Sequence, residues 1–141
     1  MIPSDIQFTG THQAQLDSTL RLHIPADWQH SRAGLLYLLC SCKSKHAYIK
    51  AINEAAYDER FRMVMDSQIT MTEKERLVGR LANSCRAAKP DRRNRIALPK
   101  DLAGQAGLEN SRAITLVGGG NYFEIWETGI YDASMQQGQD P

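Results

Sequence analysis

Two stretches of this chain, residues 16–28 (LDSTLRLHIPADW) and residues 90–102 (PDRRNRIALPKDL), align with each other without a gap. The shared pattern is Asp, three residues, Arg, then apolar-x-apolar-Pro-x-Asp-apolar. Four identical residues and three matching apolar positions fall in one register, an agreement that chance rarely produces over so short a stretch. We therefore expect the chain to contain two copies of one small module.

Each copy has the pattern of a short strand that ends at a proline. Residues 21–24 and 95–98 alternate between exposed and apolar positions, as half-buried strands do. The proline that follows has no N–H for a strand ladder and therefore ends the strand. In the second copy we predict a short helix over residues 100–106, which ends at Gly107 because glycine tolerates the left-handed conformation found there.

A hairpin follows in each copy. Residues 113–117 and 122–126 read as strands around the turn Gly118-Gly119-Gly120-Asn121. In the first copy, residues 35–40 and 47–50 play the same roles around residues 41–45, and this hairpin is less regular. Extended segments, residues 12–16 and 85–89, precede the Asp turns.

Between the copies the apolar period becomes helical. Tyr57, Phe61, Val64 and Met65 fall on one helical face. A second helix is predicted to begin at Thr72, where residues 72–75 (TEKE) fit a capping box, and Leu77, Leu81 and Cys85 continue its apolar side.

The sequence therefore predicts an α+β fold that is mainly β, in which two modules pack about a pseudo-twofold axis because one alone has too little core. We expect the first module over residues 6–52, a helical linker over residues 53–84, the second module over residues 85–131 and a C-terminal tail over residues 132–141.

Composition excludes several classes of protein. With 141 residues, 42% hydrophobic and 23% charged, the chain is typical of a globular domain. No apolar run reaches the roughly 20 residues of a membrane span. The first ten residues (MIPSDIQFTG) lack the basic and apolar regions of an export signal, so we expect a cytoplasmic protein without membrane contact.

We expect no metal, cofactor, small-molecule substrate or enzymatic activity. Three cysteines (Cys40, Cys42 and Cys85) form neither a paired disulfide framework nor a zinc set. The four histidines have no metal spacing, and Glu124 has no partner carboxylate for acid–base work. The Gly118-Gly119-Gly120 run leads into a strand, which favours a hairpin turn over a phosphate loop.

Charge is distributed unevenly although the formal net charge is only +1. Residues 86–100 contain six basic side chains and one acidic one, whereas residues 1–28 contain one basic and three acidic ones. A concentration of positive charge of this kind can face the phosphates of a nucleic acid. The candidate DNA-binding residues are Arg21, Arg86, Lys89, Arg92, Arg93 and Arg95.

Arg21 and Arg95 each have two readings. An arginine at the start of a strand can read guanine in the major groove or clamp a phosphate. Alternatively, each arginine pairs with the aspartate four residues back, Asp17 or Asp91, and fixes the turn. Both readings can hold together, since an aspartate can orient an arginine that binds DNA. Arg92 and Arg93 favour phosphate contact, while Arg86 and Lys89 fit a phosphate contact and a solvated charge equally well.

The chain resembles the MraZ family of bacterial transcriptional regulators, whose members carry two SpoVT/AbrB-type modules. The paired Asp-x-x-x-Arg motif together with the Val-Gly…Phe-Glu-Ile-Trp block is specific, and the resemblance covers about residues 6–131. The matching pieces are Phe8-Thr9-Gly10, Asp17/Arg21, Ile24-Pro25-Ala26, Asp91/Arg95, Leu98-Pro99, Ala106-Gly107-Leu108 and residues 116–126.

The resemblance implies an interleaved swapped-hairpin β-barrel and assembly into a homo-oligomeric ring. It also implies binding to tandem repeats of double-stranded DNA upstream of the division and cell-wall gene cluster, usually to repress it, at the nucleoid. Two alternatives remain open: an AbrB-type antitoxin, and an oligomeric protein-interaction scaffold that has lost DNA binding.

This chain departs from the family pattern at the residue before each motif arginine. The family usually has glycine there, whereas this chain has Leu20 and Asn94. Because leucine adopts the left-handed conformation poorly, we expect the first loop to have a different shape from the second. We also expect the second copy to provide more of the DNA-binding energy.

Overall fold

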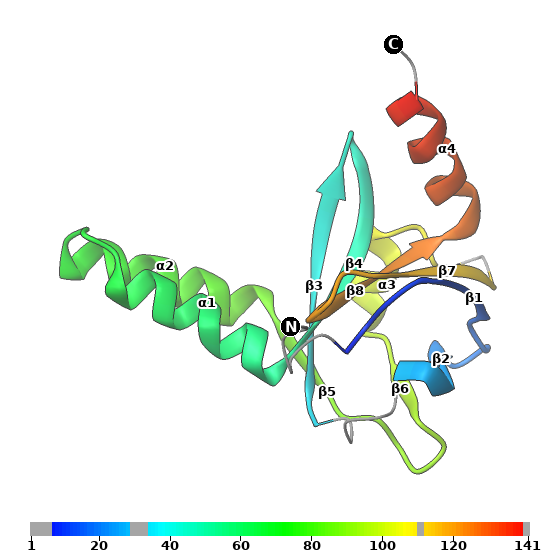
Figure 1. Ribbon diagram of the computed structural model, residues 1–141, viewed down its shortest axis with the longest axis horizontal. Coiled ribbons are helices and arrows are strands. Elements are labelled where there is room, and N and C mark those ends of the chain that lie inside the picture. The colour runs from blue at the N-terminus through cyan, green and yellow to red at the C-terminus, as the bar shows by residue number, and fades with distance from the viewer. Residues whose placement is uncertain (1–6, 29–33, 110–111, 140–141) are drawn as a thin grey trace.

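The computed structural model describes residues 7–28, 34–109 and 112–139. Residues 1–6, on which part of the export expectation rests, lie outside this range. The fold is α+β and mainly β, as the sequence predicts (Figure 1). Its elements are β1 (Thr11–Gln15), β2 (Arg21–His23), the 3-10 helix η1 (Ala26–Trp28), β3 (Leu36–Lys43), β4 (His46–Asn53), α1 (Glu54–Asp66), α2 (Met71–Ser84), β5 (Arg86–Ala88), β6 (Arg95–Ala97), α3 (Lys100–Gln105), β7 (Ala113–Gly118), β8 (Tyr122–Glu127) and α4 (Thr128–Gln139).

The strand order is symmetric under the duplication. Six antiparallel strands form one sheet in the order β1-β7-β8-β4-β3-β5. Exchanging each strand for its counterpart in the other copy (β1 for β5, β3 for β7, β4 for β8) gives the same order read backwards. Moreover, β1 pairs with β7 and β5 pairs with β3, so each copy supplies an edge strand to the hairpin of the other.

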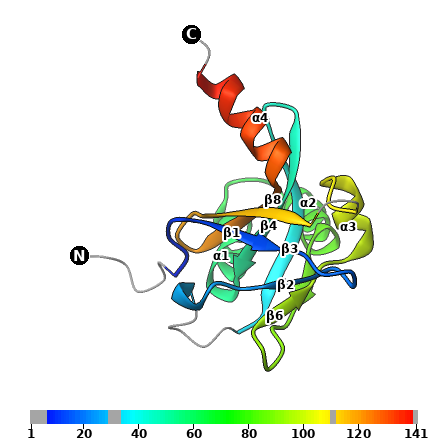
Figure 2. The ribbon, with the colours of Figure 1, turned by 90° about the vertical axis from the view of Figure 1, so that its right-hand side faces the viewer.

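A separate two-stranded ribbon joins the two motifs. Strands β2 and β6 pair antiparallel, with Leu22 opposite Ile96 at the centre. Beyond the ladder, Ile24 N donates to the Asn94 carbonyl at 2.9 Å and Leu98 N donates to the Leu20 carbonyl at 2.8 Å, which are equivalent bonds. Figure 2 shows the ribbon below the large sheet, at the end opposite α4. The two copies therefore meet at their motifs.

The core lies between the ribbon and the large sheet. Leu22 and Ile96 are fully buried, and the inward positions of β3, β4, β7 and β8 meet them in one apolar cluster. Arg21 and His23, which flank Leu22 along β2, are exposed. The alternation read from the sequence thus sets which ribbon side chains face the core and which face outward.

The first hairpin is more regular than the sequence predicts. Strands β3 and β4 form an uninterrupted ladder from Leu36 opposite Asn53 to Lys43 opposite His46. The connection is Ser44-Lys45, with φ values of 48° and 69°. A two-residue turn with both residues left-handed matches the twist of the flanking strands, so the hairpin forms without glycine.

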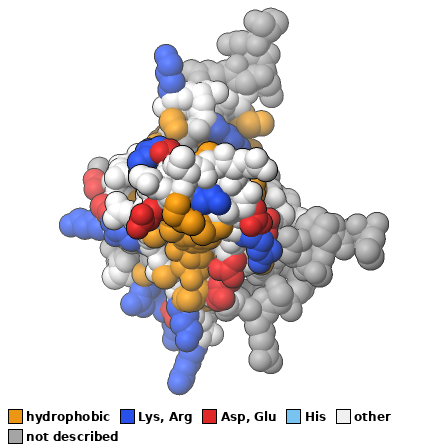
Figure 3. All heavy atoms as spheres, turned by 90° about the vertical axis from the view of Figure 1, so that its left-hand side faces the viewer, with side chains coloured by type: hydrophobic (Ala, Val, Ile, Leu, Met, Phe, Trp, Pro, Cys, Tyr) orange, Lys and Arg blue, Asp and Glu red, His pale blue; other side chains and the backbone are white. Residues whose placement is uncertain are grey.

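Helices α1 and α2 project from the sheet as a hairpin (Figure 1). Tyr57 of α1 stacks on Tyr37 of β3, with ring centroids 3.6 Å apart. Figure 3 shows apolar side chains gathered on the face of the molecule toward which this hairpin projects. The large apolar residues exposed near the hairpin's tip are Met63, Met65, Ile69 and Met71.

The helix caps correct one prediction. Helix α2 does not begin at Thr72; its N-cap is Thr70, whose hydroxyl accepts a hydrogen bond from Glu73 N at 3.1 Å. Both threonines fit the N-cap preference, and the extended backbone of Thr70 identifies it as the N-cap.

The C-terminal segment also differs from the prediction. Helix α4 occupies most of the segment that the sequence assigns to a tail, and Tyr131 packs edge-on against Trp126. The division into two modules and a linker stays a prediction.

Candidate nucleic-acid interface

The two motif loops have the same shape. In the first, Asp17 N donates to the Arg21 carbonyl at 3.1 Å, and Leu20 N donates to the Asp17 carbonyl at 3.1 Å. In the second, Asp91 and Asn94 make the equivalent bonds to the Arg95 and Asp91 carbonyls, both at 2.9 Å. Leu20 and Asn94 are both left-handed, with φ values of 62° and 58°. The expectation that leucine changes the first loop is therefore wrong.

Leu20 is held in this conformation by its surroundings. Its side chain is partly buried and packs against the apolar core, and its carbonyl accepts the bond from Leu98 N. A non-glycine residue in the left-handed region costs on the order of 1–2 kcal/mol. Burial of the leucine side chain can offset a cost of that size.

Each aspartate fixes its loop through backbone amides. Asp17 Oδ1 accepts hydrogen bonds from Thr19 N, Arg21 N and the Thr19 hydroxyl at 2.8–2.9 Å. Asp91 Oδ1 accepts from Arg93 N and Arg95 N, both at 2.9 Å. These bonds lower the pKa of both carboxyls, with the largest contribution from the amide of the motif arginine in each case. The aspartates thus determine the geometry of the loops.

The lowered pKa values predict a pH dependence of stability. A carboxyl whose pKa is lower in the folded chain than its ordinary value of 3.8 stabilises the fold above that value. The stabilisation is lost as the pH falls through the lowered folded-state pKa. We expect a double variant, Asp17→Asn with Asp91→Asn, to melt at a lower temperature than the unaltered chain at neutral pH.

When the pH falls below 3.8, the melting temperature of the double variant should decrease by less than that of the unaltered chain. Differential scanning calorimetry across this range measures the effect. Asp66→Asn, at the end of α1, removes a carboxylate outside the two loops and should follow the unaltered chain. A double variant with the same acid sensitivity as the unaltered chain would show that the loop carboxylates contribute nothing.

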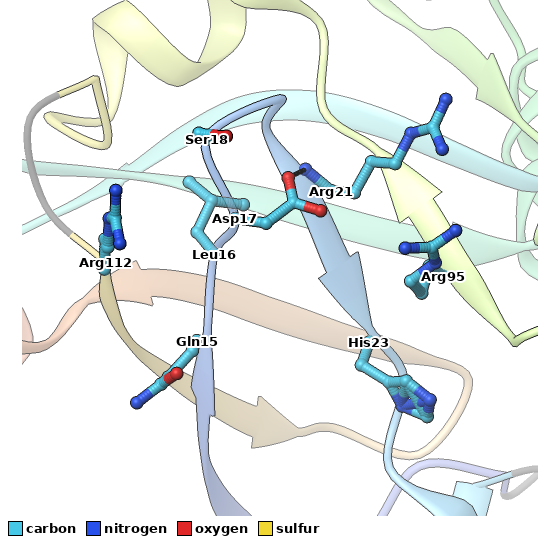
Figure 4. Close-up of a pocket in the computed structure, with 8 residues that line it drawn as sticks. All are labelled: Gln15, Leu16, Asp17, Ser18, Arg21, His23, Arg95 and Arg112. Atoms are coloured by element: carbon cyan, nitrogen blue, oxygen red, sulfur yellow. Dashed lines mark hydrogen bonds between the residues drawn. The ribbon is translucent and has the colours of Figure 1, made fainter.

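The two motif arginines differ in how they are held. Arg95 Nε donates to Asp91 Oδ2 at 3.1 Å, and 28% of the arginine side chain is exposed. Arg21 is exposed, and within the described residues its guanidinium has no ion pair. Both project from the outward face of the ribbon (Figure 4). Of the two readings from the sequence, pairing with the motif aspartate applies to Arg95, and neither arginine is sealed inside the protein.

An open hollow of about 400 Å³ lies beside the first loop and joins the two arginines to other polar groups. In Figure 4 its walls come from β1, the first loop, the ribbon and the residue before β7. Sequence reasoning missed two residues here, His23 and Arg112. The lining residues are Gln15, Leu16, Asp17, Ser18, Arg21, His23, Arg95 and Arg112.

His23 could have been found from the sequence, because it is two residues after Arg21 and therefore shares its face of the strand. The ribbon register places it directly opposite Arg95. Arg112 had no such signal, since it lies far from both motifs in the sequence. Only the pairing of β1 with β7 brings it to the first loop.

The remaining basic residues are divided between two places. Arg92 and Arg93 are exposed in the second loop, and Lys89 is exposed just before it. Arg86 is apart from them: it forms an ion pair with Asp101 of α3 at 2.5 Å. It lines a different hollow, which includes Cys40 and Asp101. The structure therefore does not bring Arg86 together with the loop arginines.

Asn94 carries a local defect that predicts a stabilising substitution. Its side-chain Nδ2 is buried and has no hydrogen-bond partner within the described residues. Its backbone is left-handed, which glycine adopts without strain. We expect Asn94→Gly to raise the free energy of unfolding by about 1 kcal/mol, because it removes the unsatisfied amide and the strain. Urea denaturation measures the free energy of unfolding. Asn94→Ala, which keeps a Cβ, should lower it. An equal decrease in both variants would contradict the argument.

Two absences concern only the part of the chain that the structure describes. No helix there is long and apolar enough to cross a membrane. No three side chains of His, Cys, Asp or Glu in that part gather as metal ligands.

Known proteins similar to this chain come from one family. A family model described as "MraZ protein, putative antitoxin-like" matches residues 83–140. A transcriptional regulator MraZ from Thermobifida fusca is 28% identical over 134 residues, which are 92% of this chain and 90% of the relative. One from Clavibacter michiganensis subsp. michiganensis is 25% identical over 125 residues, 89% and 84% of the two chains. The family model and the two relatives agree, and the chain is similar to the MraZ family over most of its length.

Proposed function

We propose that this protein is a sequence-specific transcriptional regulator that binds double-stranded DNA through its β2–β6 ribbon and the two motif loops. The observation that carries the proposal is the pair of equivalent loops, fixed by Asp17 and Asp91, with Arg21 and Arg95 on the outward face of one ribbon. A two-stranded ribbon fits the major groove of B-DNA. Arginines on its outward face are then in position to reach guanine edges or phosphates.

The finer proposal follows the family. The protein would repress the division and cell-wall gene cluster by binding tandem repeats in its promoter, at the nucleoid in the cytoplasm. It would do so as a homo-oligomeric ring, in which several ribbons contact successive repeats. Linked weak contacts raise the overall affinity without any new interaction, because each further contact becomes intramolecular.

The experiment that tests the proposal begins with a pool of random-sequence duplex DNA. Duplexes retained by the purified full-length protein are sequenced through successive rounds of selection. We expect a short motif to emerge, to recur in tandem upstream of the protein's own gene, and to bind less tightly as salt increases. A pool that stays random, or binding that does not respond to salt, would contradict the proposal.

An antitoxin is the second candidate, because the matching family model is itself described as antitoxin-like. An antitoxin of this type binds DNA and also neutralises a protein toxin. Purification of the tagged protein from its own organism distinguishes the two functions. A stoichiometric small protein that arrests growth when expressed alone would support the antitoxin. The protein-interaction scaffold would be supported by the absence of any DNA binding.

A further inference from the structure

We propose that Arg112 is a phosphate-binding residue that serves the first motif loop, and that its ligand is a backbone phosphate of the DNA duplex. This inference rests on the proposed function and names a contact outside both motifs. Three observations carry it: the position of Arg112 in the hollow, the absence among the described residues of an ion pair to its side chain, and the distribution of charge between the two loops.

Arg112 is anchored at the first loop by its backbone. Its carbonyl accepts a hydrogen bond from Leu16 N at 2.9 Å, and Leu16 directly precedes Asp17. The arginine directly precedes β7, which pairs with β1 from Ala113 opposite Gln15 onward. Its position beside the loop is therefore set by the strand ladder, and does not depend on its side chain.

The side chain of Arg112 is exposed and lines the hollow that Arg21 and Arg95 also line (Figure 4). Glu109 and Arg112 line a neighbouring hollow of about 320 Å³, yet their side chains form no ion pair within 4.0 Å. Within the described residues, Arg112 makes no ion pair at all. Its charge is thus available to an anion that approaches the first loop.

The two loops differ in the number of basic residues that they contain. The second loop contains Arg92 and Arg93 and follows Lys89, whereas the first loop has Ser18 and Thr19 at the positions of these arginines. In the sequence, the first loop therefore has no cation besides Arg21. Arg112 supplies one from the other copy.

The pseudo-twofold symmetry supports this assignment. Ala14 pairs with Ile114, and its counterpart Ala88 pairs with Leu36. Arg112, two residues before Ile114, therefore corresponds to Gly34, two residues before Leu36. Gly34 has no side chain, and the second loop beside it already has its own arginines. Each loop thus has at least one cation besides its motif arginine, at positions that the symmetry does not relate.

The test is a salt titration with a random-sequence duplex, because a phosphate contact carries no sequence information. We expect Arg112→Ala to weaken binding by roughly fivefold to tenfold at low salt and to make the slope of log K against log salt less steep by about 0.9, the value for one phosphate. Arg112→Lys should keep the slope. Circular dichroism of each variant checks that the fold is intact.

The charge-matched control is Arg80→Ala, an exposed residue of α2 in the helical hairpin on another side of the sheet. If Arg112→Ala matches Arg80→Ala in affinity and slope while Arg21→Ala and Arg95→Ala bind weakly, Arg112 is no phosphate contact and the DNA-binding function stands. If the unaltered protein binds no duplex at any salt concentration, the proposed function fails and this inference fails with it.

Discussion

Replacing Arg21 and Arg95 together with alanine is expected to abolish sequence-specific DNA binding, with a loss of affinity of at least about thirtyfold. Each arginine that reads a base through two hydrogen bonds contributes about 1–3 kcal/mol of discrimination. Two such contacts correspond to at least about 2 kcal/mol, and each 1.4 kcal/mol is a factor of ten. Fluorescence anisotropy at fixed salt, with the duplex recovered by selection, measures the loss.

The two single variants should differ, with Arg95→Ala the more harmful. Arg95 is held by Asp91 at 3.1 Å, so its guanidinium loses less conformational freedom on binding than the unpaired guanidinium of Arg21. Arg92 and Arg93 are exposed in the same loop, and in the proposed complex they would add phosphate contacts to the second copy. The shape of the loops does not contribute to this difference, since both loops have the same backbone hydrogen bonds. Equal losses in the two single variants would remove the asymmetry.

Two further measurements keep this prediction specific. Arg80→Ala removes one positive charge from the helical hairpin and should leave the affinity nearly unchanged, because the ribbon is untouched. Random-sequence duplex should lose less affinity than the selected duplex in the double variant, because arginines that read bases contribute most to the specific complex. A uniform loss for both duplexes would instead assign Arg21 and Arg95 to phosphates.

The sequence predicts the ribbon well because its information is local. The period of two at residues 21–24 and 95–98, with a proline after each strand, leaves few alternatives for the backbone. The duplication adds a constraint that a single motif lacks, since two equivalent strands in one chain can pair about a twofold axis. Helix α3 and the left-handed Gly107 after it also agree with the prediction.

Long-range packing explains what the sequence does not predict. Leu20 disfavours the left-handed conformation by itself, yet its partly buried side chain and the bond from Leu98 N hold it there. Arg112 reaches the first loop only through the β1–β7 ladder, which joins residues about a hundred positions apart. Pairings between segments so distant leave no periodic signal in the chain. The place of Arg112 in the hollow was therefore not predictable from either motif.

Charge shows the same limit at the level of single residues. Arg86 belongs to the basic stretch that favours DNA, but its side chain turns toward Asp101 of α3. Asp101 is one of the repeated motif residues, and its counterpart Asp27 has no such partner among the described residues. A count of basic residues therefore overstates the charge that faces one surface, since an ion pair removes part of it.

Replacing Trp28 with alanine is expected to destabilise the fold more than a truncation at the equivalent position of the second copy, Leu102→Ala. Trp28 is 1% exposed, and its ring contacts Phe8 and Phe123 at centroid distances of 5.5 and 5.0 Å. Its Nε1 donates to the Thr9 carbonyl at 2.8 Å. Removal of a buried tryptophan costs about 3–5 kcal/mol, a large part of the stability of a small domain.

Leu102 is 6% exposed and also lies in the core, but it is smaller and donates no side-chain hydrogen bond. We therefore expect Leu102→Ala to cost about 2–4 kcal/mol. Trp28→Phe should recover much of the loss because it restores an aromatic ring and loses only the hydrogen bond to the Thr9 carbonyl. Urea denaturation of the three variants orders them. Trp28 is the last residue of η1, which follows β2 and Arg21 along the chain. If Trp28→Ala lowers the free energy of unfolding by less than Leu102→Ala does, the first copy folds independently of this aromatic cluster.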